Sequence, residues 1–490
     1  FGGRRVLRSA GGRARTEAQG ETYAEIAEHG YRLTSDDNMA TFAVDVDTAA
    51  YANVRRILRE GRRPRADAVR LEELLNYFRY DDPEPTGPAP LAVTIEVASC
   101  PWNPAHRLAR VGLKSSAIPA GNRQPANLVF LIDVSGSMDS ARKLPLLKRA
   151  MHLLTQNLTG RDRVAIVVYA GAAGLVLPST VCTDTVPVLE ALAALEPRGS
   201  TAGEAGIRLA YQVAREHRIE DGINRIVLAT DGDFNVGIRD QGELVALIEE
   251  EAASGISLTV LGFGTGNLND ALCEQLADHG DGNYAYVDSL AEARKVLVEE
   301  LGSTLQTVAR DVKLQVSFDP SRVAAHRLLG YENRRLTHRD FADDTQDAGE
   351  VGAGHGVTAL FEWIPVGQEL PTFDGSQIDP HAGLESWEGA GLVRVDVRYK
   401  DPAGGASRLL TRRAQDSGLD CEAASDDLRF AASVAWFAEL LRGSSHVAGT
   451  TFSDARRLAA SSLGADVGGH RAAFLELVDR ARELAREARR

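Results

Sequence analysis

The chain has few cysteines and no long apolar run. Its 490 residues include only four cysteines, which are far apart and form no CxxC pair: Cys100, Cys182, Cys273 and Cys421. This spacing argues against a cysteine zinc site, but it leaves open whether the thiols form disulfides. No apolar run approaches the roughly 18 residues that a transmembrane helix needs, so the sequence predicts no membrane-spanning segment.

An excess of positive charge is also missing. Asp and Glu outnumber Lys and Arg by 69 to 55, which gives a net charge of −14. No overall field therefore attracts phosphate backbones, and we do not expect nucleic acid as a partner. The hydrophobic share of 44% and the charged share of 25% are typical of soluble globular domains. At this length, two to four domains are expected.

The pattern of apolar residues along the sequence divides the chain into four parts. Residues 1–30 lack apolar periodicity and are predicted to be a flexible tether. Residues 31–120 contain helical and strand-like segments, residues 121–305 form a central domain, and residues 306–490 are first β-rich and then helical. Because the record opens at Phe1 rather than at Met, a signal peptide or lipid anchor upstream of it remains an open possibility.

The central domain alternates strand-length apolar runs with amphipathic helical stretches. This alternation predicts an α/β fold with a doubly wound, mostly parallel sheet, and a flanking β-rich module and a C-terminal helical segment complete the expected architecture. The runs are rich in β-branched residues, as expected of strands that are buried on both faces. They are LVFLID at 128–133, RVAIVVYA at 163–170, RIVLAT at 225–230 and ISLTVLGFG at 256–264.

A group of oxygen-bearing side chains follows the first of these strands. Asp133, Ser135 and Ser137 form a DxSxS run just before a predicted helix. In an open α/β sheet, ligands bind at the carboxyl ends of the strands. Carboxylate and hydroxyl oxygens suit a hard cation, although Asp and Ser are also ordinary turn and helix-cap residues.

Two further segments are expected at the same edge of the sheet. Thr201 precedes a helix that begins near Gly203, and Asp231 follows the RIVLAT strand. Each would bring an oxygen ligand to the DxSxS loop.

In these five positions the sequence resembles the von Willebrand factor type A (VWA) family. The resemblance implies a metal-ion-dependent adhesion site in which the hydroxyls of Ser135, Ser137 and Thr201 contact the metal, while Asp133 and Asp231 act mainly through water. Mg²⁺ suits such a site best, with Mn²⁺ or Ca²⁺ as alternatives. The resemblance also implies that a carboxylate of a partner protein fills an open metal position, and that the chain is not an enzyme.

Segments outside the central domain resemble bacterial YfbK-type VWA proteins. They are DVDTAAYANVRR at 45–56, AVRLEELLNYF at 68–78, CPWNPAHRL at 100–108, LLGYENRRL at 328–336 and DFADDTQDAGEVGAGHGVTALFE at 340–362. Similar proteins often carry a lipoprotein signal, which implies a location at the cell envelope, with the cytoplasm as the alternative. Contact with a membrane would then depend on a lipid anchor that this record does not contain.

Two alternative functions remain open at this point. Asp45 and Asp47 match the DxDxT motif of haloacid dehalogenase-like phosphatases, in which the first Asp is the nucleophile and the second the acid/base. In that reading, the late pair Asp343–Asp344 imitates the acidic motif that holds Mg²⁺. The other alternative is a scaffold whose VWA domain binds partners without a metal.

Overall fold

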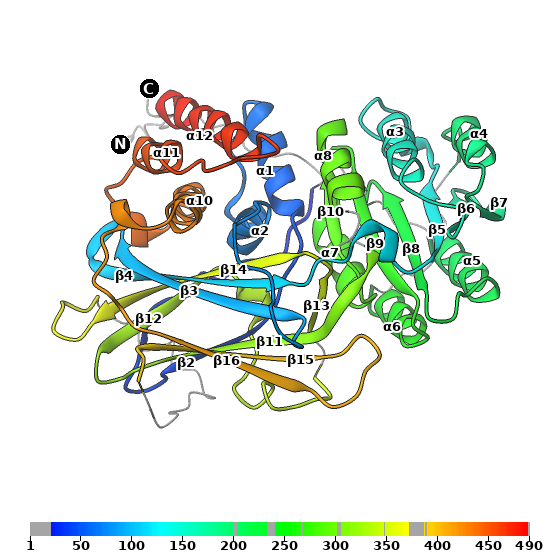
Figure 1. The fold of residues 1–490 in the computed structure, drawn as a ribbon. Coiled ribbons are helices and arrows are strands. Elements are labelled where there is room, and N and C mark those ends of the chain that lie inside the picture. The colour runs from blue at the N-terminus through cyan, green and yellow to red at the C-terminus, as the bar shows by residue number, and fades with distance from the viewer. Residues whose placement is uncertain are drawn as a thin grey trace, which may run out of the picture.

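The fold was described from a computed structural model, which covers residues 21–199, 203–232, 241–265, 268–300, 305–346, 348–371, 387 and 390–488. These residues form one parallel-rich sheet with helices on both faces, two antiparallel sheets that pack face to face, and a layer of helices over one of the antiparallel sheets (Figure 1). The predicted α/β class with a flanking β-rich module and C-terminal helices is confirmed.

The central sheet has the strand order β10-β9-β8-β5-β6-β7. Its strands are β5 (Ala126–Asp133), β6 (Arg163–Tyr169), β7 (Ala173–Val181), β8 (Ile223–Thr230), β9 (Ser257–Phe263) and β10 (Tyr284–Val287). All neighbours are parallel except the edge strand β7, which runs antiparallel to β6. The four strands predicted from apolar runs are β5, β6, β8 and β9, whereas the partly exposed β7 and the short β10 were not predicted.

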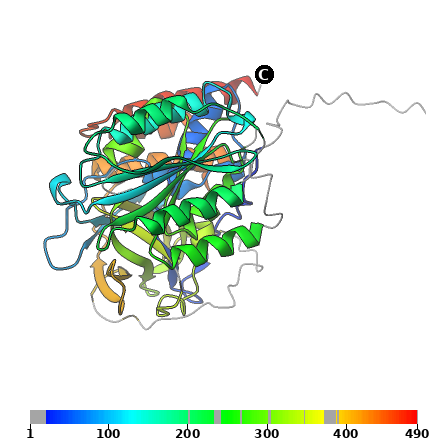
Figure 2. The ribbon, with the colours of Figure 1, turned by 90° about the vertical axis from the view of Figure 1, so that its right-hand side faces the viewer.

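Helices cover both faces of this sheet. Successive strand residues point to opposite faces, and in the buried strands both sets are apolar. Leu128, Phe130 and Ile132 of β5 belong to the core beneath α3 (Leu144–Thr155), α4 (Val186–Ala194) and α8 (Leu290–Arg294). Val129 and Leu131 belong to the opposite core, beneath α5 (Gly203–Glu216), α6 (Gln241–Ala252) and α7 (Asp270–Asp278). Figure 2 faces this domain and shows helices above and below the twisted sheet.

The other two sheets form a β-sandwich built from both flanking regions. One sheet has the order β1-β12-β14-β4-β3 and the other β13-β11-β15-β16, with β2 paired to β11. The strands are β1 (Arg32–Leu33), β2 (Met39–Ala43), β3 (Leu91–Cys100), β4 (Asn103–Ser115), β11 (Thr307–Phe318), β12 (Val323–Leu329), β13 (Gly349–Gly352), β14 (Gly356–Pro365), β15 (Val393–Lys400) and β16 (Arg408–Ala414). Each of these sheets thus combines strands from residues 31–120 with strands from residues 306–490.

A helical layer lies on the outer face of the first sandwich sheet. It consists of α1 (Ala49–Arg59), α2 (Leu71–Asn76), α10 (Asp426–Arg442), α11 (Phe452–Ala460) and α12 (His470–Glu487). Phe474, Leu477 and Ala481 of α12 are buried in the core of this layer. The apolar face of the last helix therefore packs against the other helices of the layer. Among the described helices, none is long and apolar enough to cross a membrane.

The beginning of the described chain contacts the central domain and the helical layer. Thr22 forms backbone hydrogen bonds with Leu268 and Asp270 of the central domain. Glu21 accepts a hydrogen bond from the guanidinium of Arg56 at 3.0 Å. Residues 21–23 are thus fixed to the folded body, and residues 1–20 lie outside the described ranges.

Candidate metal site

The DxSxS loop follows the central strand β5, whose eight residues are all buried. The backbone N–H of Ser135 donates to Asp133 Oδ1 at 2.8 Å, which turns the carboxylate toward the loop. The hydroxyl oxygens of Ser135 and Ser137 lie 2.9 Å apart. The loop therefore brings together the two hydroxyls that the sequence predicted as metal ligands.

Asp231 follows β8, the strand next to β5. The register pairs Ile132 with Ala229, so both strands end at the same edge of the sheet, as predicted. Asp231 is fully buried. Its Oδ2 lies 2.8 Å from Nζ of Lys143, the residue just before α3. This lysine was not predicted as part of the site, because nothing in the local sequence links it to Asp231.

The stem of Lys143 reaches Asp231 across Gly264. Gly264 lies just beyond β9 with φ +84°, and a Cβ atom there would lie 2.2 Å from Lys143 Cε. A side chain at this position would therefore displace the lysine. The missing side chain at Gly264 thus leaves room for the Lys143 stem that brings the ammonium group to Asp231.

Thr201 lies outside the described residues, but the segment before it contacts the DxSxS loop. The N–H of Gly136 donates to the carbonyl of Gly199 at 3.0 Å, and the N–H of Arg198 donates to the carbonyl of Val134 at 2.6 Å. Helix α5 then begins at Gly203. Gly199, two residues before Thr201 in the sequence, therefore lies beside the DxSxS loop.

A tyrosine forms part of the floor beneath the site. Tyr169 ends β6, the other neighbour of β5, and its carbonyl accepts a hydrogen bond from the N–H of Val134 at 3.0 Å. Burial, reinforced by the nearby Asp133 carboxylate, raises the pKa of Tyr169 well above its ordinary value. The phenol therefore stays protonated and adds no negative charge to the site.

The donor set fits a hard divalent cation. Mg²⁺ takes oxygen ligands and keeps several of its waters, so two hydroxyls beside buried carboxylates suit it. Within the described residues, no group of three or more His, Cys, Asp or Glu side chains is arranged to hold a metal ion. The predicted set does not require such a group, because it combines two carboxylates with three hydroxyls.

Gly232 gives a test of how closely the Asp231 loop is packed. Its φ is +86°, and a Cβ atom would lie 2.5 Å from the backbone nitrogen of Asn269. Gly232→Ala is expected to lower the free energy of unfolding by about 1–3 kcal/mol and to weaken metal binding, because the loop must move. Thermal melting and Mg²⁺ titration measure both effects. Gly174→Ala is the control, since its Cβ meets nothing within 4 Å; equal melting points for the two variants would contradict the prediction.

The residues of the phosphatase alternative are held in ion pairs and backbone contacts. Asp47 Oδ1 accepts the N–H of Tyr284 at 2.7 Å, and Asp45 Oδ1 accepts the N–H of Asp47 at 2.9 Å. Both carboxylates lie 3.5 Å from Arg334 Nη2. Asp343 instead accepts hydrogen bonds from Thr345. These contacts place Asp45 and Asp47 at the junction between the central domain and the sandwich.

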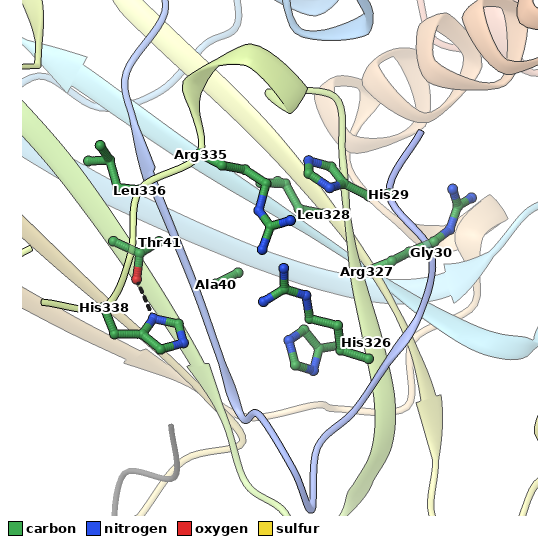
Figure 3. A pocket seen from close by; sticks show the side chains of 11 residues that line it. His29, Gly30, Ala40, Thr41, His326, Arg327, Leu328, Arg335, Leu336 and His338 are labelled. Carbon is green, nitrogen blue, oxygen red and sulfur yellow. Dashed lines mark hydrogen bonds between the residues drawn. The ribbon is translucent and has the colours of Figure 1, made fainter. Parts of the chain in front are cut away.

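A separate basic pocket lies between β2 and β12. It has a volume of about 20 Å³. Thr41 Oγ1 lies 2.8 Å from Nδ1 of His338 at one side (Figure 3). Burial lowers the pKa of His326 to about 4, so this imidazole is neutral at pH 7. No local sequence pattern predicts this pocket.

Comparisons with known proteins cover most of the chain. Three family profiles match it: "von Willebrand factor" at residues 17–110, "von Willebrand factor type A domain" at residues 128–233, and "Uncharacterized protein YfbK, C-terminal" at residues 303–484. The YfbK protein of Escherichia coli strain K12 is 40% identical over 470 residues, which are 93% of this chain and 80% of that protein.

Two further matches are more distant. The human inter-alpha-trypsin inhibitor heavy chain H4 is 32% identical over 165 residues, which are 32% of this chain and 18% of that protein. A solved von Willebrand factor type A structure from Catenulispora acidiphila is 16% identical with a TM-score of 0.43, and the match covers 79% of this chain and 89% of that one. The 40% identity to the Escherichia coli protein, together with the matching profiles on both sides of the VWA domain, shows that the chain belongs to the YfbK family of VWA proteins.

Proposed function

We propose that the chain is a metal-dependent protein-binding protein. A divalent cation, Mg²⁺ in preference to Mn²⁺ or Ca²⁺, is bound by Asp133, Ser135, Ser137, Thr201 and Asp231, and an acidic side chain of the partner completes its coordination. The observation that carries the proposal is the meeting of Ser135 and Ser137 with Asp133 at one end of β5, next to the strand that precedes Asp231.

The balance of charge at the site supports an anionic partner group. Three of the proposed ligands are neutral hydroxyls, so only the two carboxylates offset the charge of the metal, and Lys143 already compensates part of the charge on Asp231. The metal when bound would supply a Lewis-acidic position that accepts a carboxylate. Gly136 and Ser137 are exposed, which leaves the loop open to a partner from that side.

A metal-independent scaffold is the second candidate, and one observation favours it. The ammonium of Lys143 lies 2.8 Å from Asp231 Oδ2 and compensates this buried carboxylate without a metal. In that case the domain would bind partners by shape alone.

Thermal melting separates the two candidates. With Mg²⁺ at about 100 times its Kd, binding to the folded state alone adds about 2.7 kcal/mol of stability. We expect the melting midpoint to rise in Mg²⁺ compared with chelator, and a pull-down of partners to depend on Mg²⁺ in the same way. Identical midpoints and identical captured proteins under the two conditions would favour the scaffold.

A further inference from the structure

A cavity of about 350 Å³ lies apart from the metal site, where the central domain meets the sandwich. The link between β2 and α1 contributes Asp45 and Asp47, the end of α7 contributes Asp278, and the turn after β12 contributes Arg334. Glu350, His279 and Arg335 also line the cavity. Arg335 is exposed, so the cavity opens to solvent on that side, while Asp45 and Asp47 form its buried wall.

The buried wall of the cavity carries carboxylates with incomplete partners. Arg334 forms ion pairs with three of them. Its Nη2 lies 2.7 Å from Asp278 Oδ1, 3.5 Å from Asp45 Oδ1 and 3.5 Å from Asp47 Oδ2. Asp45 is 2% exposed and Asp47 is 3% exposed. In the described part of the chain, Oδ2 of each has no hydrogen-bond partner. Buried carboxylate oxygens without such partners are costly.

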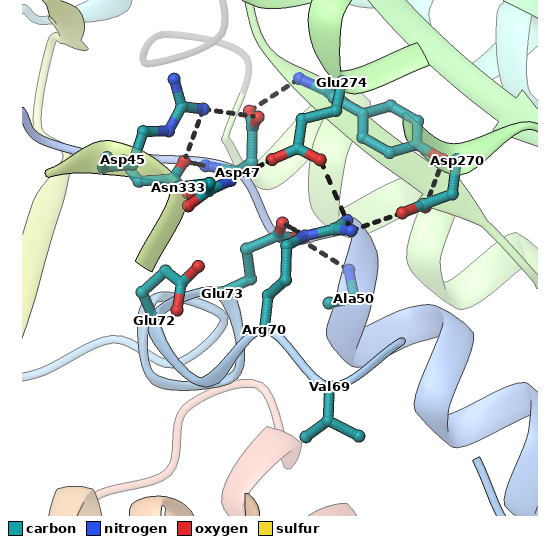
Figure 4. Close-up of polar contacts among 12 residues, drawn as sticks. Asp45, Asp47, Ala50, Val69, Arg70, Glu72, Glu73, Asp270, Glu274 and Asn333 are labelled. Carbon is teal, nitrogen blue, oxygen red and sulfur yellow. Dashed lines mark hydrogen bonds and ion pairs between the residues drawn. The ribbon is translucent and has the colours of Figure 1, made fainter. Parts of the chain in front are cut away.

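The layer behind this wall adds further negative charge. Arg70 pairs with Glu73 and Asp270, and it lies 3.5 Å from Glu274, whose Oε1 accepts from Asn333 (Figure 4). Arg70 and Arg334 are each surrounded by three carboxyl groups: Glu73, Asp270 and Glu274 lie around Arg70, and Asp45, Asp47 and Asp278 lie around Arg334. Burial raises the pKa of Glu274 to about 7 and the pKa of Asp47 well above its usual range. Such groups stay partly protonated unless a cation compensates them.

The arrangement suits an organic cation better than a metal ion. The described acidic side chains do not converge in any group of three that could hold a metal. They are spread along a cavity with room for several non-hydrogen atoms. An ammonium group donates several hydrogen bonds at once, which suits the two buried Oδ2 atoms. Among the described residues these atoms accept no hydrogen bond, and Asp47 Oδ2 has only the guanidinium of Arg334 at 3.5 Å.

The geometry points to a binding site for a small organic cation, in which Asp45 and Asp47 receive an ammonium group inside the cavity. Asp278 and Glu350 extend the acidic lining, so a molecule with two ammonium groups matches the cavity better than one with a single group. The cation is either a free amine or the lysine side chain of a peptide. This site is separate from the proposed metal site and does not depend on it.

Isothermal titration calorimetry on the full chain tests the site. The titrants are 1,4-diaminobutane, its uncharged counterpart 1,4-butanediol, and Nα-acetyl-lysine amide, at pH 8 with saturating Mg²⁺ present throughout. We expect saturable one-to-one binding of the diamine and none of the diol. Tighter binding of the diamine than of the lysine derivative would assign a free amine, and the reverse order would assign a peptide side chain.

Variants locate the binding within the cavity. Asp47→Asn is expected to weaken binding of the diamine by at least about tenfold, because a charge-assisted hydrogen bond is lost. Asp47 also accepts a hydrogen bond from the N–H of Tyr284. If loss of that bond unfolds Asp47→Asn, the variant Asp278→Asn tests the same cavity. Glu190→Gln, an exposed position on α4, is the matched control and should bind as the wild type does. Absence of saturable heat, or unchanged affinity in folded Asp47→Asn and Asp278→Asn, would overturn the proposal.

Discussion

Asp133→Ala is expected to weaken Mg²⁺ binding by about 100-fold and to abolish metal-dependent capture of a partner. Loss of a group that orients a metal's ligands or waters costs about 10–100-fold in affinity. Asp133 has that role twice, because it faces the predicted metal and also fixes the N–H of Ser135. Isothermal titration calorimetry with MgCl₂ measures the loss, and far-UV circular dichroism reports whether the fold is retained.

Two further variants show whether the loss belongs to the site. Ser135→Ala removes one hydroxyl ligand without removing a buried charge, so it should also abolish binding with a smaller effect on stability. Asp139→Ala changes an exposed carboxylate of the same loop and should leave Mg²⁺ affinity as it is in the wild type. Wild-type affinity in both Asp133→Ala and Ser135→Ala would rule out the proposed ligand set.

Arg327→Met is expected to be the most destabilising single change in the sandwich. The guanidinium lies 2.8 Å from Glu362 and 3.1 Å from Glu439, and all three side chains are 1% exposed. Removal of one partner leaves buried charges without compensation, which typically costs about 3–5 kcal/mol. Because Glu439 belongs to α10 and Glu362 to β14, the loss should loosen the helical layer from the sheet. Urea denaturation measures the change in unfolding free energy.

The same ion pairs give the protein a predicted acid sensitivity. Although burial opposes ionisation, Arg327 and His106 together lower the pKa of Glu362 from 4.5 to about 2. The stabilisation from this group is therefore present above pH 4.5 and is lost as the pH falls toward 2. Arg327→Met should remove that part of the acid dependence. Arg322→Met, an exposed arginine just before β12, is the control; equal stability of the two variants at pH 7 would contradict the prediction.

Features that depend on local sequence were predictable. The long apolar runs of β5, β6, β8 and β9 identify strands that are buried on both faces. Asp133, Ser135 and Ser137 lie within five residues, so their meeting follows from one strand and one turn. The edge strands β7 and β16 were missed, because their side chains are largely exposed and lack the apolar pattern of a core strand.

Contacts between distant parts of the chain were not predictable. Lys143 pairs with Asp231 across 88 positions, and Arg334 pairs with Asp45 across 289. Such pairs depend on how the central domain, the sandwich and the helices pack, and composition or periodicity does not encode that packing. The pairing of strands from both flanking regions in shared sheets was missed for the same reason.

Anomalous diffraction from crystals grown with Mn²⁺ tests the central claim most directly. Mn²⁺ takes the same oxygen ligands as Mg²⁺ and scatters anomalously. The account predicts one strong peak at the carboxyl end of β5, in contact with the hydroxyls of Ser135, Ser137 and Thr201, with Asp133 and Asp231 around it. Density for Thr201 or Asp231 turned away from the two serines, or no peak at this edge of the sheet, would contradict it.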